Sequence, residues 1–141
     1  MTIIGLDKPE DYSGSKAVHF VGRLNKDDAE QYEKMIKYYQ ESDLFLLPTK
    51  AECAGIVFSE AAMYGLPSFT HNTGGVMSYV EDGVTGRGLE LGATAKEFAD
   101  AILDMLDKNQ YADWSKNARR KYEKELNWER WLANCEKIIE E

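Results

Sequence analysis

The sequence is poor in the features that mark several large classes of protein. Its 141 residues include only two cysteines, Cys53 and Cys135, which are far apart and follow no metal-ligand spacing. Two reduced thiols of a cytosolic protein are therefore expected. The longest apolar run is Leu44–Leu47, far short of the ~20 residues that span a bilayer. The chain is expected to fold around an apolar core, without a disulfide framework or a membrane span.

Positive charge is also scarce. Lys and Arg together number 17 against 25 Asp and Glu, which gives a net charge of −8. Because clustered Lys and Arg drive binding to phosphate backbones, nucleic acid is not an expected partner. The first residues, Met1–Gly5, lack the basic region of a secretory signal. A cytoplasmic location is therefore expected. Hydrophobic residues make up 43% of the chain, which is enough for the core of one domain.

The hydrophobic pattern changes its period several times along the chain. Short apolar runs that end in glycine, proline or a polar turn predict strands at residues 2–5, 18–22, 44–48, 67–70 and 85–89. Helical periodicity predicts a helix capped by Asn25, helices over about 55–64 and 76–81, and helix throughout the last third. Gly65 is expected just past the end of the helix at 55–64.

This alternation predicts an α/β domain with a doubly wound parallel sheet and right-handed crossovers. One domain is expected over residues 1–141, with a helical tail at 95–141. The unbroken run Leu44–Leu47 predicts a strand covered on both faces. Two apolar stripes in the tail are expected to pack into the core. Their members are Phe98, Ile102, Met105 and Leu106, and then Trp128, Trp131, Leu132, Cys135, Ile138 and Ile139.

The most informative segment is Pro48–Ala61, where a strand runs through a loop into a helix. Glu52 lies in the loop, Gly55 opens the helix, and Glu60 lies about one turn inside it. The first N–H groups of a helix and the positive end of its dipole bind anions. Carboxylates on either side of such a site accept hydrogen bonds from hydroxyls. A ligand with an anionic centre and hydroxyls on both flanks, such as a nucleotide sugar, has the matching form.

The same segment resembles the Glu-x7-Glu signature of the group 1 (family 4) retaining glycosyltransferases, which have the GT-B fold. The similarity continues through other segments in the family's order. These are Val18–Leu24, Tyr38–Thr49, Ala61–Pro67, Gly74–Val76 and Val80–Gly86. The resemblance implies a Rossmann-like half of a GT-B fold that binds a nucleotide-diphosphate sugar. It also implies transfer of the sugar to an acceptor hydroxyl with retention of configuration.

On the sugar side, the resemblance assigns the catalytic role to Glu52, whose carboxylate would hold hydroxyls of the donor sugar. Backbone N–H groups of Cys53, Ala54 and Gly55 would assist it. Preorganised donors of this kind would stabilise the charge on the departing oxygen without a covalent nucleophile.

On the nucleotide side, the amides of Ile56 and Val57 would meet the diphosphate, and Glu60 would bind the ribose hydroxyls. The turn at Arg23 and Leu24 would lie against the nucleobase. Donors in the family bind without an obligatory metal, so no metal ion and no further cofactor are expected.

Members of the family carry an N-terminal domain that supplies the acceptor site, and their donor domain starts with a strand and helix that grip the phosphates. Both are expected to be absent here, so this chain alone is expected to be inactive in transfer. An acceptor glycan or glycolipid would be the further partner. The family's last helix crosses back to the N-terminal domain, so part of the Trp128–Ile139 stripe is expected to be exposed. The basic residues Arg119–Lys121 favour a solvated helix face over membrane docking, because acidic residues interrupt them.

Other functions remain open at this point. An epimerase of nucleotide sugars would favour acidic residues after the double glycine, where Val76–Ser78 stand instead. A non-catalytic nucleotide-binding α/β domain is a further alternative. Glu52 and Glu60 could also simply favour the helix dipole. His71 follows a strand at the ligand-facing edge, so substrate contact and core packing are both open for it.

Overall fold

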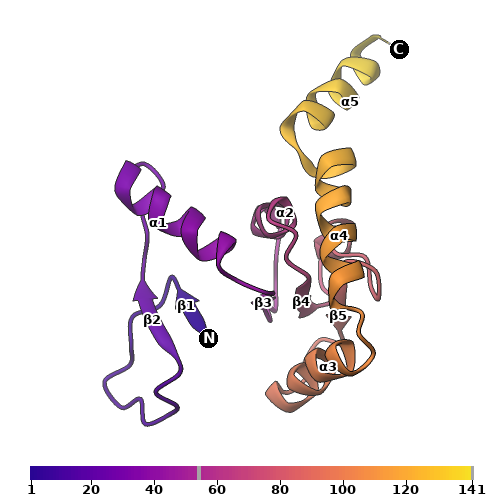
Figure 1. Cartoon of the computed structure of the whole chain (residues 1–141). Coiled ribbons are helices and arrows are strands. Elements are labelled where there is room, and N and C mark those ends of the chain that lie inside the picture. The colour runs from indigo at the N-terminus through magenta and orange to yellow at the C-terminus, as the bar shows by residue number, and fades with distance from the viewer. Residues whose placement is uncertain (54, 141) are drawn as a thin grey trace. The chain divides into compact units, whose positions relative to one another are not determined.

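Every strand of the structure runs parallel to its neighbour. The computed structural model describes residues 1–53 and 55–140 and divides into two compact units, Met1–Glu41 and Ser42–Glu141 (Figure 1). The predicted α/β class with parallel strands is confirmed. The extent of the domain over residues 1–141 stays a prediction.

The first unit consists of one parallel strand pair and one helix. Strand β1 (Thr2–Ile4) pairs with β2 (His19–Gly22), and α1 (Ala29–Gln40) follows. The helix is capped by Asp28, whose side chain accepts the N–H of Gln31 at 2.9 Å. The predicted N-cap Asn25 is wrong, because Asn25 instead accepts the N–H of Asp27 at 3.0 Å and closes a turn before the helix.

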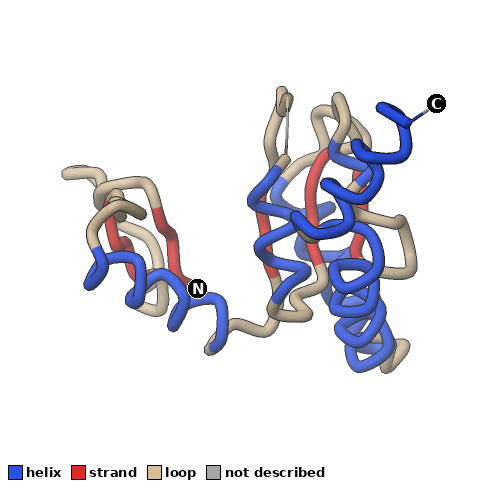
Figure 2. Tube along the Cα trace, turned by 90° about the horizontal axis from the view of Figure 1, so that it is seen from above, coloured by secondary structure: helices blue, strands red, loops and turns tan. Residues whose placement is uncertain are grey.

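The second unit is built on a three-stranded parallel sheet of order β3-β4-β5 (Figure 2). Its strands are β3 (Phe45–Leu47), β4 (Ser68–His71) and β5 (Gly86–Leu89). Helix α2 (Ile56–Met63) connects the first two strands, and the 3-10 turn η1 (Val76–Ser78) precedes β5. Gly86 lies directly against β4, since a Cβ there would meet the Ser68 carbonyl oxygen at 2.0 Å.

Two apolar clusters cover the two faces of this sheet. Phe58, Val76 and Val80 pack with Phe45 and Leu47 on one side. On the other, Phe69 of β4 packs with residues of the helical tail, namely Phe98, Met105 and Trp114. Side chains of a strand alternate between faces, so packing on both faces is what a doubly wound sheet requires.

The central and edge strands of this sheet differ in burial. All four residues of β4 are buried, as the central position demands. In β3, the side chain of Leu46 is 36% exposed, so the prediction of a strand covered on both faces is wrong. An apolar run alone does not distinguish a central strand from one that has a single partner.

The tail forms α3 (Ala95–Asp107), α4 (Tyr111–Lys121), the π-helical turn η2 (Tyr122–Leu126) and α5 (Trp128–Glu140). Helix throughout this region was predicted, but the helices are separated at residues 108–110 and at Asn127. Phe98 and Met105 are buried as predicted, whereas Leu106 of the same stripe is 48% exposed, so its expected place in the core is wrong. Trp128 and Trp131 are 68% and 55% exposed, so their expected place in the core is wrong, while the exposure implied by the family resemblance is found. Helix α5 contacts mainly the adjoining turn η2.

Candidate functional site

The loop after β3 carries Glu52 to the amino end of α2. Gly55 is the N-cap, with a φ of +56° that favours glycine, and no side chain caps the helix at this residue. The half-buried Glu52 turns back on its own loop. Its Oε1 accepts the N–H of Cys53 at 3.0 Å and that of Gly55 at 3.2 Å. The Gly55 N–H, at the helix start that was expected to offer unpaired N–H groups to an anion, is therefore already bonded to the carboxylate of its own loop.

The remaining predicted residues of this segment lie in the first turns of α2. Ile56 and Val57 are its first two residues, whose N–H groups have no carbonyl partner within a helix. Glu60 follows one turn later and is half-buried. The positive end of the helix dipole thus lies between Glu52 and Glu60 along the chain. Ala54 lies outside the described residues.

The loop after β4 packs against the Glu52 loop. Thr73 Oγ1 donates to the Lys50 carbonyl oxygen at 3.2 Å. A Cβ on Gly74, which has a φ of +52°, would lie 2.5 Å from the Glu52 carbonyl oxygen. Only glycine at position 74 therefore allows the two backbones to come this close. The parallel register of β3 and β4 places both loops at the carboxyl edge of the sheet, where ligands bind in such folds.

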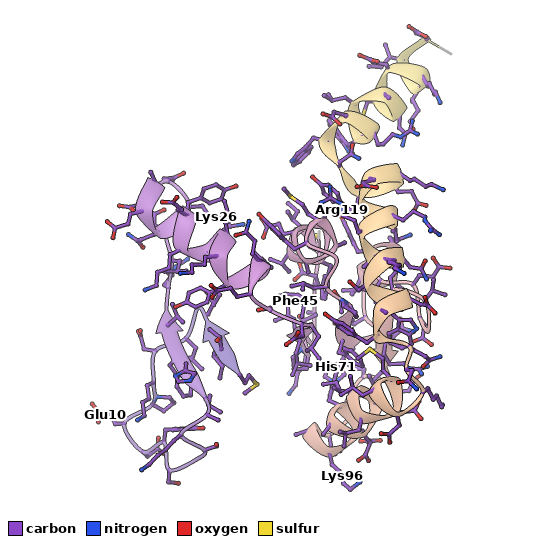
Figure 3. The ribbon with its side chains drawn as sticks, viewed as in Figure 1. Glu10, Lys26, Phe45, His71, Lys96 and Arg119 are labelled. Carbon is purple, nitrogen blue, oxygen red and sulfur yellow. The ribbon has the colours of Figure 1, made fainter. Side chains whose placement is uncertain are left out.

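His71, labelled in Figure 3, belongs to this packing. Its side chain is only 4% exposed. Its Nδ1 lies 3.1 Å from the Thr49 carbonyl oxygen, and its Nε2 lies 3.4 Å from the Ala93 carbonyl oxygen. Its imidazole ring packs against the Phe98 ring in a T-shaped arrangement, with the ring centroids 5.1 Å apart. Direct contact with a substrate, one of the two interpretations left open by the sequence, does not fit a buried ring whose two nitrogens both face carbonyls.

Arg23 and Leu24 belong to the first unit. They line a hollow of about 440 Å³ together with Asn25, Lys26 and Gln31. The Gln31 side chain accepts the N–H of Asn25 at 3.0 Å and holds the turn against α1. The structure thus brings together Glu52, Gly55, Ile56, Val57 and Glu60 within the second unit. The role of Arg23 and Leu24 toward a nucleobase stays a prediction.

Sequence reasoning missed the residues that support the Glu52 loop. These are Thr73 and Tyr79, whose ring carbons lie 3.1 Å from the position that a Cβ would take on Gly55. The only signal for Thr73 was its place shortly after a strand that was predicted to end at this edge, and Tyr79 had no such signal.

Within residues 1–53 and 55–140, no group of three or more His, Cys, Asp or Glu is placed to hold a metal ion. No helix in the described part of the chain is long and apolar enough to cross a membrane.

The family described as glycosyl transferases group 1 matches residues 6–121, which include every element from β2 to α4. This chain belongs to the group 1 glycosyltransferases. Among curated relatives of this group 1 chain, spore coat protein SA from Bacillus subtilis is 29% identical over 132 residues, covering 89% of this chain and 35% of the relative. A D-inositol 3-phosphate glycosyltransferase from Mycolicibacterium smegmatis is 32% identical over 80 residues, covering 57% of this chain and 18% of the relative.

Solved structures give the same fold. Sucrose-phosphate synthase from Thermosynechococcus elongatus matches with a TM-score of 0.75 at 22% identity. The match covers 99% of this group 1 chain and 37% of the synthase chain. HepE from Anabaena, crystallised with UDP-glucose, has a TM-score of 0.61 at 26% identity, covering 76% of this chain and 28% of its own. The group 1 chain spans between 20% and 35% of the length of the first two curated relatives that it matches.

Proposed function

We propose that this chain is the donor-binding part of a retaining glycosyltransferase of family 4, one domain over residues 1–141 that takes a nucleotide-diphosphate sugar. The observation that carries the proposal is the pair of carboxylates at the start of α2, Glu52 in the loop before the helix and Glu60 one turn inside it, with this end of the helix at the carboxyl edge of a parallel sheet. The crystallisation of HepE with UDP-glucose supports the choice of ligand class.

In this proposal, the sugar is held by Glu52 and the surrounding amides. The carboxylate accepts hydrogen bonds from two sugar hydroxyls, and the N–H groups of Cys53, Ala54 and Gly55 turn toward sugar oxygens. For this, Glu52 must leave the Cys53 and Gly55 amides, which it holds at 3.0 and 3.2 Å. The amides and the sugar hydroxyls donate to the same charged acceptor, so the exchange replaces two charge-assisted hydrogen bonds by two others, and the freed amides donate to sugar oxygens.

The nucleotide is held by the helix. The amides of Ile56 and Val57 meet the diphosphate at the positive end of the α2 dipole. Glu60, one turn further along α2, accepts the ribose hydroxyls, and the Arg23–Leu24 turn lies against the base. Backbone N–H groups supply the phosphate contacts, so no metal ion or further cofactor forms part of the proposal.

The reaction is the exchange of one C–O bond for another at the anomeric carbon. The bond from this carbon to the diphosphate breaks, the acceptor oxygen bonds the same carbon with retention, and the acceptor proton passes to the departing diphosphate. Preorganised amides at the end of α2 stabilise the negative charge that grows on the leaving oxygen. The acceptor, a glycan or glycolipid, is bound by other parts of a longer protein, and this chain alone binds the donor without transferring it. The proposed location is the cytoplasm, at the membrane face where the acceptor is a lipid.

The test is an amide NMR titration of the chain with UDP-glucose, UDP, GDP-mannose and ADP-glucose. We expect shifts at residues 55–60 and 23–24 with one nucleotide series. Glu60→Ala should weaken binding of both the nucleotide and its sugar conjugate by about tenfold, the loss of one strong charged hydrogen bond. Glu52→Ala should weaken only the sugar conjugate.

Glu90→Ala is the matched control, since Glu90 is an exposed acid of the same unit that lies after β5 and outside the proposed site. Shifts that arise equally in Glu60→Ala and in the unsubstituted chain would contradict the ribose role. Binding of no nucleotide by a folded sample would contradict the proposal as a whole.

A further inference from the structure

Two loops of the second unit are in contact, and the contact is made by backbone carbonyl oxygens of the Glu52 loop that point toward the loop after β4. In the Glu52 loop, the carbonyls of Thr49, Lys50 and Glu52 all face residues 71–74 at the end of β4. His71 Nδ1 lies 3.1 Å from the first of these oxygens, and Thr73 Oγ1 lies 3.2 Å from the second. The third oxygen fits against Gly74, where only a hydrogen can be accommodated.

His71 differs from the other two contacts in its burial. The ring is 4% exposed, whereas Thr73 is half-buried and Gly74 is exposed. A hydrogen bond that is shielded from water is less easily exchanged for one to solvent, so the His71 contact is the firmest of the three. The Phe98 ring, 5.1 Å away between centroids, fixes the plane of the imidazole.

The imidazole also joins two segments that come far apart in the sequence. Nδ1 faces the Thr49 carbonyl in the loop before α2, while Nε2 faces the Ala93 carbonyl in the loop before α3, at 3.4 Å. An imidazole tautomer with one N–H donates to only one of these two carbonyls, and the Nδ1–H tautomer donates to Thr49, the nearer of the two. The shorter contact is the one to Thr49, which lies two residues after β3 in the loop that carries Glu52.

We propose that His71 is a positioning residue that holds the Glu52 loop in the conformation needed to receive the donor sugar. The proposal rests on the donor-binding function given above. It places His71 behind the loop and away from the ligand. Ordering a loop before a ligand arrives raises affinity by reducing the entropy lost on binding. The benefit falls on the sugar contacts, because the diphosphate amides belong to α2 and are ordered by the helix itself.

Three substitutions separate this role from simple packing. His71→Asn keeps a donor at about the place of Nδ1 and can still bond the Thr49 carbonyl. His71→Gln puts its amide near the place of Nε2, toward Ala93. His71→Leu fills the volume and donates to neither. If His71 served only to fill space, Asn and Gln variants of equal thermal stability would not differ in amide exchange or in ligand affinity.

The first measurement is hydrogen exchange of the Cys53 and Gly55 amides in the chain without ligand. Both amides are held by the Glu52 carboxylate, so they report on the order of the loop. We expect their exchange to be about tenfold faster in the Leu and Gln variants than in the original chain and the Asn variant, a change of about 1.4 kcal/mol in opening free energy. Thr73→Val removes the hydroxyl that donates to the Lys50 carbonyl and should raise exchange in the same direction by a smaller factor.

The second measurement is calorimetric binding of UDP-glucose and UDP. In the Leu and Gln variants, the advantage of UDP-glucose over UDP should disappear, while UDP itself binds as before. Equal exchange rates in all three His71 variants and in Thr73→Val would overturn the positioning role. If the unsubstituted chain binds UDP-glucose no better than UDP, the assigned sugar contacts fail, and the exchange rates still decide whether His71 holds the loop.

Discussion

Helix α2 begins and ends at a glycine with positive φ, yet its two ends are completed in different ways. At the carboxyl end, the N–H of Gly65 bonds the Ala62 carbonyl at 2.9 Å and that of Leu66 bonds the Ala61 carbonyl at 3.0 Å, which is a Schellman motif. The Arg119 guanidinium from α4 donates to the Met63 carbonyl. At the amino end, the bonds come from Glu52 in the preceding loop.

The difference shows which end of α2 is built for stability. Gly65 and Arg119 join α2 to α4, and their removal disturbs packing between two helices. Glu52 satisfies amides that a ligand could equally satisfy. The carboxyl end of α2 is completed by backbone bonds and by α4, and the amino end by the Glu52 carboxylate. The two ends are therefore expected to respond differently to substitution, and four changes test this.

The largest effect on stability is expected at the carboxyl end, from Gly65→Val. The φ of +70° is strained for a β-branched residue, and a Cβ would lie 3.2 Å from the Ser115 carbonyl oxygen. The free energy of unfolding should fall by about 2 kcal/mol. Urea unfolding followed by circular dichroism measures this loss. An unchanged midpoint would show that the glycine at the carboxyl end of α2 does not contribute to stability.

A second helix of the same unit gives a reference for an amino end closed by side chains. In α3, Thr94 Oγ1 accepts the Glu97 N–H at 3.3 Å, and Glu97 Oε2 accepts the Thr94 N–H at 2.8 Å. Thr94→Ala should lower the free energy of unfolding by about 1 kcal/mol.

The loss at Thr94 should also depend on pH. The Thr94 backbone N–H, and next its hydroxyl, hold the pKa of Glu97 below its usual range. A lowered pKa in the folded state stabilises the fold above the ordinary carboxyl range, and this contribution disappears as the pH falls through the lowered pKa. Thr94→Ala keeps the backbone bond to this carboxylate and removes the hydroxyl bond, so its effect should be larger at neutral pH than in acid by the share of the hydroxyl alone. An equal effect at both pH values would show that the hydroxyl does not lower the pKa of Glu97.

Arg119→Met should have a smaller effect, about 0.5 kcal/mol, because the guanidinium is half exposed and its ion pair with Glu123 at 2.7 Å lies on the surface. The thioether side chain keeps the apolar stem. Lys124→Met, a neighbouring exposed cation in η2, is the control in the same unfolding experiment. A loss as large as that of Gly65→Val would show that the charge, and not the backbone motif, closes this end.

The smallest effect on stability is expected at the amino end. Glu52→Gln keeps an oxygen for the Cys53 and Gly55 amides but removes the charge, so unfolding should change by no more than about 0.3 kcal/mol. Affinity for UDP-glucose should nevertheless decrease clearly relative to UDP. A large loss of stability with unchanged affinity would reverse the comparison between the two ends.

Much of this arrangement could be predicted from local sequence. Gly65 and Pro67 indicate where α2 ends, and the strand periods indicate the parallel α/β class, because these features depend on residues close in the chain. The start of α1 could not be predicted as reliably, since Asn25 and Asp28 both suit an N-cap and the choice depends on turn geometry.

Features that depend on contacts between segments far apart in the sequence could not be predicted. The exposure of Trp128 and Trp131 depends on what packs against α5, and the same amphipathic pattern suits a buried helix and an uncovered one. Similarly, the sequence placed His71 at the correct edge of the sheet. Its burial between the Thr49 and Ala93 carbonyls, each 22 positions away in the chain, has no local signal.

The three tryptophans of the chain lie in two contrasting environments. Trp114 is 3% exposed beside Phe69, while Trp128 and Trp131 stand in solvent with ring centroids 5.8 Å apart. Indole fluorescence shifts to longer wavelength when the ring enters water. Unfolding of the second unit should therefore shift the emission of one indole to the red, while any event that covers α5 should shift two indoles to the blue. A single emission spectrum thus reports loss of the core and occupation of α5 with opposite signs.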